Sequence, residues 1–87
     1  MRTSPGSWPS SSTNGGDRDD ELSARERALS CLAADVLNQT LDESFALHVD
    51  LATAAGAGRA QINAVLLLVA EYGIAKAWRA YRALGDL

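Results

Sequence analysis

The sequence is short of the residues on which several classes of protein depend. Its 87 residues contain one cysteine, Cys31, and one histidine, His48. A single cysteine excludes an intramolecular disulfide framework and a cysteine-rich zinc site, and a single histidine without clustered further ligands cannot build a metal site. We therefore expect no metal site, and we expect Cys31 to be a small buried residue of the core.

Positive charge and long apolar segments are also scarce. The net charge of −3 and the pI of about 4.9 argue against nucleic-acid binding, which needs a dense basic patch. The longest apolar run, Ala64 to Ala70, has seven residues, whereas a membrane-spanning helix needs about 20. The first 20 residues lack the apolar stretch of a secretory signal. These absences predict a soluble cytoplasmic protein that binds neither nucleic acid nor membranes.

Proline is absent beyond Pro9, and the composition changes near residue 21. Residues 1–21 are rich in serine, glycine, threonine and aspartate, with Trp8 as the only aromatic side chain. Such a segment cannot bury enough surface to offset the entropy of ordering it. The sequence therefore predicts a disordered tail over 1–21, followed by one small domain over 22–87.

That domain has helical periodicity and no alternation typical of strands. SARE at 23–26 is a capping box that predicts a first helix over about 24–38. TLDE at 40–43 is a second capping box, with Thr40 as the expected N-cap residue of the second helix. A third helix is expected to begin near Arg59, and a fourth to cover about 74–84 after the break at Tyr72-Gly73. The prediction is an all-α domain of about four helices.

The second and third helices are apolar around most of their circumference. Leu47 and Leu51 widen the apolar face of the second helix, and Leu67 and Leu68 widen that of the third. A domain of this size cannot cover so much apolar surface by itself, so we expect another copy of the chain to cover part of it. If these two helices form an antiparallel hairpin at the glycine-rich turn, Glu71 lies near the level of His48.

Three segments in order resemble the carboxymuconolactone decarboxylase family. They are LSARERALSCLAA at 22–34, FALHVDLATAAGAGRAQINAVLLLVAEYG at 45–73, and A-x-x-A-x-x-A-L at 77–84. The resemblance covers about 22–85. It implies an all-helical fold like that of alkylhydroperoxidase D, with orthogonal and antiparallel helix packing, and assembly into homotrimers or hexamers.

The family divides by chemistry. The peroxidase branch carries a Cys-x-x-Cys pair before the histidine, whereas the decarboxylase branch lacks the pair and keeps the histidine. With the family histidine placed on His48, the two cysteine positions fall on Leu41 and Ser44. Without an attacking thiol we expect no thiol peroxidase activity. The chain also has the serine- and glycine-rich tail where the family usually has another helix.

The resemblance implies a catalytic role for His48. An imidazole suits that role, because it titrates near pH 6.5 and can relay a proton to a lactone or enol. We expect Glu71 to orient that imidazole or to act as a second base. The alternative for His48 is a hydrogen-bonded core residue. The alternatives for Glu71 are exposure to solvent or an ion pair with Lys76 or Arg79 of the last helix.

The candidate substrate-binding residues are Ser44, one turn before His48, and the aromatic residues Tyr72 and Trp78. Their alternatives are a serine on the helix surface and, for Tyr72, Trp78 and Tyr81, aromatic residues of the core or of an interface. Lys76, Arg79 and Arg82 would either attract a carboxylated substrate or form a solvated face.

Two functions remain open from the sequence. The first is a lyase of small-molecule metabolism that needs no cofactor and carries out acid/base chemistry, either decarboxylation or isomerisation, on a carboxylated lactone or related small ring. The second is a non-catalytic member of the same fold that forms oligomers or binds a ligand.

Overall fold

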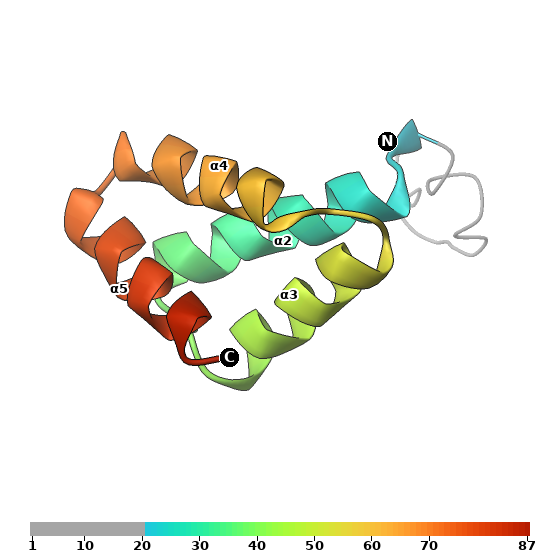
Figure 1. Cartoon of the computed structure of the whole chain (residues 1–87). Helices are drawn as coiled ribbons and strands as arrows, with labels where there is room; N and C mark the ends of the chain where they lie inside the picture. The colour runs from blue at the N-terminus through green and yellow to red at the C-terminus, as the bar shows by residue number, and fades with distance from the viewer. Residues whose placement is uncertain (1–20) are drawn as a thin grey trace, which may run out of the picture.

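The computed structural model describes residues 21–87. The predicted tail therefore lies outside the described residues, apart from Glu21. The described part of the chain forms four α-helices and contains no strand: α2 (Ala24–Asn38), α3 (Glu43–Ala54), α4 (Arg59–Ala70) and α5 (Ile74–Gly85) (Figure 1). This confirms the prediction of a small all-α domain.

Helix α2 begins and ends where the sequence predicts. The Ser23 hydroxyl accepts a hydrogen bond from the backbone N–H of Glu26 at 3.0 Å, and the Glu26 carboxylate accepts one from the backbone N–H of Ser23 at 2.8 Å. This is the predicted capping box. The last helical residue is Asn38, and the C-cap residue Gln39 has a left-handed φ of 60°, a conformation often found just after the last helical residue.

The predicted start of the second helix is wrong by two residues. Helix α3 begins at Glu43, and its N-cap residue is Asp42, whose side chain makes no capping hydrogen bond. The Thr40 hydroxyl turns back to the preceding helix instead, where it donates a hydrogen bond to Asp35 Oδ1 at 2.7 Å. A carboxylate acceptor on α2 thus takes the place of the expected contact with the first turn of α3.

Glycines occupy the turns that precede α4 and α5. Gly56, after α3, has a φ of 100°, which a residue with a side chain rarely adopts. Helix α4 begins at Arg59 and α5 begins at Ile74, directly after the Tyr72-Gly73 break, as predicted. Helix α5 includes Gly85, which we expected to follow it, and Asp86 is the C-cap residue.

Helix α2 is the common packing partner of the fold. It packs against α3, α4 and α5, and α4 packs against α5. Helices α3 and α4 diverge from their connecting turn and are not among the closely packed pairs (Figure 1). The hairpin that we considered for them is therefore wrong, because their buried residues pack into the cluster around α2. The core consists of Ala28, Leu32, Val36, Phe45, Val49, Ala52, Ala57, Ile62, Leu66, Val69, Ala80 and Leu84.

Several large apolar side chains lie outside this core. Leu47, Leu51, Leu67 and Leu68 are each between 49% and 72% exposed in the single chain. Cys31 is also exposed, so the expectation that it is buried was wrong. Its neighbour Leu32 faces the core on α2, which directs the side chain of Cys31 away from it. Within residues 21–87, no helix has the length and apolar character that crossing a membrane requires.

Candidate functional site

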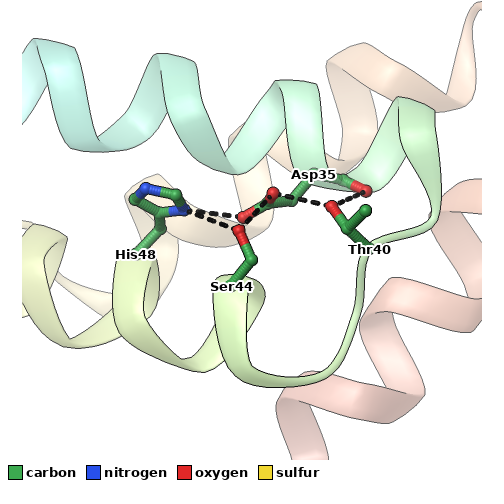
Figure 2. Close-up of polar contacts among 4 residues, drawn as sticks. All are labelled: Asp35, Thr40, Ser44 and His48. Carbon is green, nitrogen blue, oxygen red and sulfur yellow. Dashed lines mark hydrogen bonds and ion pairs between the residues drawn. The ribbon is translucent and has the colours of Figure 1, made fainter.

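Four polar side chains meet between α2 and the first half of α3 (Figure 2). Asp35 lies at their centre. Its Oδ2 is 2.7 Å from Nδ1 of His48, and its Oδ1 accepts hydrogen bonds from Thr40 at 2.7 Å and from Ser44 at 2.8 Å. We call these four residues the Asp35 cluster. One carboxylate thus joins α2, the turn after it and α3.

Asp35 lies on the core-facing side of α2, and only 7% of its surface is exposed. A buried carboxylate is costly unless hydrogen bonds replace its water. Burial by itself would raise the pKa of Asp35, but the hydrogen bonds from His48, Thr40 and Ser44 outweigh burial and hold this pKa below its ordinary value of 3.8. Asp35 is therefore ionised at neutral pH.

The ionised carboxylate determines which nitrogen of His48 carries the proton. Because an ionised carboxylate only accepts hydrogen bonds, Nδ1 of His48 must be the donor in the 2.7 Å contact. In the neutral ring, the lone pair is then on Nε2. No group of residues 21–87 forms a hydrogen bond with Nε2, and 21% of the His48 side chain is exposed. The free nitrogen can therefore exchange a proton with a small molecule.

Ser44 supports this arrangement and is not placed as a nucleophile. Its hydroxyl donates to Asp35 Oδ1 at 2.8 Å and lies 3.5 Å from Nδ1 of His48. A serine nucleophile needs the lone pair of the histidine as a base, but Nδ1 carries the proton given to Asp35. The geometry therefore fits proton transfer at Nε2 better than acylation of Ser44.

The structure does not bring Glu71 to His48. Glu71 is the exposed residue that follows α4, and no hydrogen bond or ion pair joins it to His48, Lys76 or Arg79 in the described part of the chain. Helix α4 packs on α2 and α5, so its C-terminal end lies away from α3 (Figure 1). The expected proximity of Glu71 and His48 is therefore wrong.

Two of the predicted cations support the C-terminal end of α2. Lys76 Nζ donates to the carbonyl of Leu37 at 2.8 Å, and Arg79 donates to Gln39 Oε1 at 3.3 Å. The last carbonyls of a helix carry partial negative charge, which a cation stabilises. The described contacts of Lys76 and Arg79 therefore fasten α5 to α2.

The predicted aromatic residues lie apart from the Asp35 cluster. Tyr72 is 75% exposed and Trp78 is 58% exposed, so neither belongs to the core of the single chain. Trp78 lines a groove of about 460 Å³ between α4 and α5, and the lining contains no member of the Asp35 cluster. The residues that line it are Asn63, Leu66, Leu67, Ala70, Ile74, Ala77, Trp78 and Tyr81. Of the three predicted substrate-binding residues, only Ser44 lies beside His48.

Sequence reasoning missed Asp35, although the sequence held a signal for it. Asp35 follows Leu32 by three residues and Ala28 by seven, so it shares the apolar side of α2. A carboxylate on a core-facing stripe needs a partner.

The Asp35 cluster offers one imidazole and one carboxylate as possible metal ligands. Within residues 21–87, no three histidine, cysteine or acidic residues lie together as a metal site would need.

Comparison with known proteins covers all four described helices of the chain. The model of the carboxymuconolactone decarboxylase family matches residues 11–86 of the 87-residue chain. No curated protein and no solved structure matches the chain. Because the matched segment includes all four described helices, this chain belongs to the carboxymuconolactone decarboxylase family.

Proposed function

We propose that this chain is an acid/base enzyme of the carboxymuconolactone decarboxylase type, which needs no cofactor and acts on a carboxylated lactone or related small ring. His48 is the general acid/base, and Asp35 is the positioning residue that holds its imidazole. The observation that carries the proposal is the 2.7 Å contact between His48 Nδ1 and Asp35 Oδ2, which leaves Nε2 free. Family membership supports the substrate class.

The chemistry follows from the charge of Asp35. When Nε2 accepts a proton, the ring becomes an imidazolium, and the adjacent carboxylate stabilises its positive charge. In a decarboxylation, loss of CO₂ would leave the electron pair of the broken C–C bond in the enolate of the lactone. The Nε2–H of the imidazolium would then give its proton to the ring carbon, and solvent would restore it. An isomerisation would use Nε2 first as base and then as acid.

The test is turnover of a panel of γ-lactone carboxylic acids. We expect His48→Ala to lower kcat/KM by at least ~10²-fold, the usual contribution of a general acid/base. Asp35→Asn should also lower the rate, because its amide N–H₂ can donate to Nδ1 and so favour a proton on Nε2. Ser44→Ala keeps both partners of the dyad and should have a smaller effect. Equal rates for wild type and His48→Ala would remove His48 from the mechanism.

A matched control separates the chemistry from a general loss of structure. Asp42→Asn changes an exposed carboxylate at the start of α3 whose side chain makes no capping hydrogen bond. We expect it to retain the wild-type rate. The pH dependence of the rate gives a second criterion, because His48→Ala removes the group that exchanges the proton and should abolish its contribution to that dependence.

A second candidate function is that of a non-catalytic member of the family. It is favoured by one observation, which is that the 460 Å³ groove lies between α4 and α5 and includes no residue of the Asp35 cluster. In this case the Asp35 cluster holds α2 and α3 together, and the groove takes the binding role. No turnover of any lactone acid by the folded wild type, together with wild-type stability of Asp42→Asn and a large loss of stability in His48→Ala, would favour this function.

A further inference from the structure

The groove between α4 and α5 has the size and the lining of a small-molecule site. Its volume of about 460 Å³ lies within the ~300–1,000 Å³ that is typical of ligand pockets. All of its lining residues are uncharged, and most of them are apolar. A charged ligand would lose its hydration there without gaining an ion pair from the lining. The α4–α5 groove therefore suits an uncharged ligand.

Asn63 places a side-chain amide in this largely apolar lining. Its Oδ1 is buried and accepts no hydrogen bond from any residue of the described part of the chain. A buried acceptor without a donor has lost its hydration and gained nothing in exchange, which is costly. An unpaired acceptor on a residue that lines a hollow is explained if a ligand supplies the missing donor.

The amide of Asn63 also limits which polar group such a ligand can carry. Rotation about the last side-chain bond of an asparagine is broad and roughly two-fold, so it can exchange the positions of the oxygen and the N–H₂ group. Either end of the amide can therefore face the groove. A hydroxyl group suits both orientations, since it donates to the oxygen or accepts from the N–H₂ group. A neutral hydroxyl is thus the group that best matches Asn63.

The aromatic side chains of α5 favour a flat ring as the body of the ligand. Trp78 and Tyr81 lie one turn apart on that helix, with ring centroids 5.7 Å apart and ring planes inclined by 23°. They are 58% and 54% exposed, so both rings are open to further contacts. Aromatic rings attract one another in offset-stacked or edge-to-face arrangements, beyond the effect of the area that they bury. The groove thus offers a ring surface beside an amide.

We propose that the α4–α5 groove binds a small uncharged aromatic molecule that carries one hydroxyl group, such as a phenol or a naphthol. The ring packs on the apolar lining beside Trp78, and the hydroxyl pairs with the amide of Asn63. No residue of the Asp35 cluster lines the groove, so this binding site is separate from the proposed active site. Its occupation does not depend on whether His48 is catalytic.

Equilibrium dialysis of the full chain tests the ligand class with three probes that share one ring system: 2-naphthol, naphthalene and 2-naphthoate. We expect 2-naphthol to bind wild type at least about fivefold more tightly than naphthalene, which is the effect of one neutral hydrogen bond. The charged 2-naphthoate should bind more weakly than 2-naphthol. Asn63→Leu keeps the size of the side chain and removes the amide, so it should abolish the preference for 2-naphthol over naphthalene without weakening the binding of naphthalene.

Two neighbouring leucines of α4 locate the site. Leu67 lines the groove, whereas Leu68 is 54% exposed but does not line it. Leu67→Lys should weaken the binding of 2-naphthol at least about fivefold, because it places a charge in the groove, while Leu68→Lys should bind as wild type does. In a Trp8→Phe background, Trp78 is the remaining tryptophan, and its indole N–H resonance should shift when 2-naphthol is added.

Far-UV circular dichroism establishes that each variant is folded. The inference is overturned if 2-naphthol does not bind wild type, which is the result expected where a second copy or another protein covers the groove. It is also overturned if Asn63→Leu keeps the wild-type preference, if 2-naphthoate binds more tightly than 2-naphthol, or if Leu68→Lys weakens binding as strongly as Leu67→Lys does. Should Asn63→Leu fail to fold, the three probes on wild type and the two leucine variants still decide the outcome.

Discussion

Replacement of Asp35 by asparagine tests the centre of the proposed site through stability, independently of any substrate. Asparagine has the same shape, and its amide oxygen can still accept hydrogen bonds from Thr40 and Ser44. Its N–H₂ group would face His48 Nδ1 in place of Oδ2, so a neutral hydrogen bond replaces the charge-assisted one of 2.7 Å. Hydrogen bonds to a charged group contribute about 1.5–3 kcal/mol and neutral ones about 0.5–1.5 kcal/mol, so we expect the free energy of unfolding to fall by about 1–2 kcal/mol.

The pH dependence of this loss has a definite sign. The folded pKa of Asp35 lies below its ordinary value of 3.8, so the unfolded chain binds more protons in this acidic range. The stabilisation is therefore fully present above pH 3.8 and is lost as the pH falls through the lower folded pKa. The stability difference between wild type and Asp35→Asn should accordingly shrink in acid.

Urea unfolding followed by far-UV circular dichroism measures both effects. For a small domain with a slope of about 1–1.5 kcal/mol per molar urea, the midpoint at neutral pH should fall by roughly 1–2 M. Asp42→Asn controls for the loss of a carboxylate and should change the free energy of unfolding by less than about 0.5 kcal/mol. A difference between wild type and Asp35→Asn below about 0.5 kcal/mol at neutral pH, or one that is equally large in acid, would refute the account of Asp35 given above.

Three further substitutions test the fold. Phe45→Ala removes a side chain with no exposed surface and should lower the free energy of unfolding by about 3–5 kcal/mol; a loss below 1 kcal/mol in urea unfolding would contradict its place in the core. Gly56→Ala introduces a side chain at a φ of 100°, where space is adequate but the backbone conformation costs about 1–2 kcal/mol, visible as a lower Tm. Lys76→Met removes the 2.8 Å contact with the Leu37 carbonyl and should cost about 0.3–1 kcal/mol at low salt and less at high salt; a loss that does not depend on salt would indicate that packing dominates.

The local features of the fold could be predicted from the sequence because neighbouring residues produce them. Ser23 and Glu26 lie three residues apart and satisfy the first N–H groups of α2 whatever the rest of the chain does. Thr40 shows where local reasoning ends. It has the sequence of an N-cap residue, but its hydroxyl turns to Asp35, five residues back on another element. The Thr40 hydroxyl therefore binds the buried carboxylate of Asp35 and does not cap the first turn of α3.

The position of the candidate site depended on which helices pack together, and the sequence does not settle this. The apolar sides of α3 and α4 would suit a hairpin as well as separate contacts with α2. Because both pack on α2, the partner of His48 is Asp35, 13 residues earlier, and not Glu71. The sequence predicted more apolar surface around Leu67 and Leu68 than one chain can cover, and both are exposed in the single chain. It left open whether Trp78 lies in the core or at an interface, since periodicity identifies an apolar face but not what covers it.

The divergence of α3 and α4 has a consequence for how the domain opens. The Asp35 cluster depends on contacts between α2 and α3, whereas the groove depends on α4 and α5. The two regions share α2 but have no close α3–α4 packing between them. Helices α4 and α5 can therefore loosen as one cooperative unit while the proton on Nδ1 of His48 remains held by Asp35. In hydrogen exchange, α4 and α5 should exchange together and before the amides of α2 that face α3.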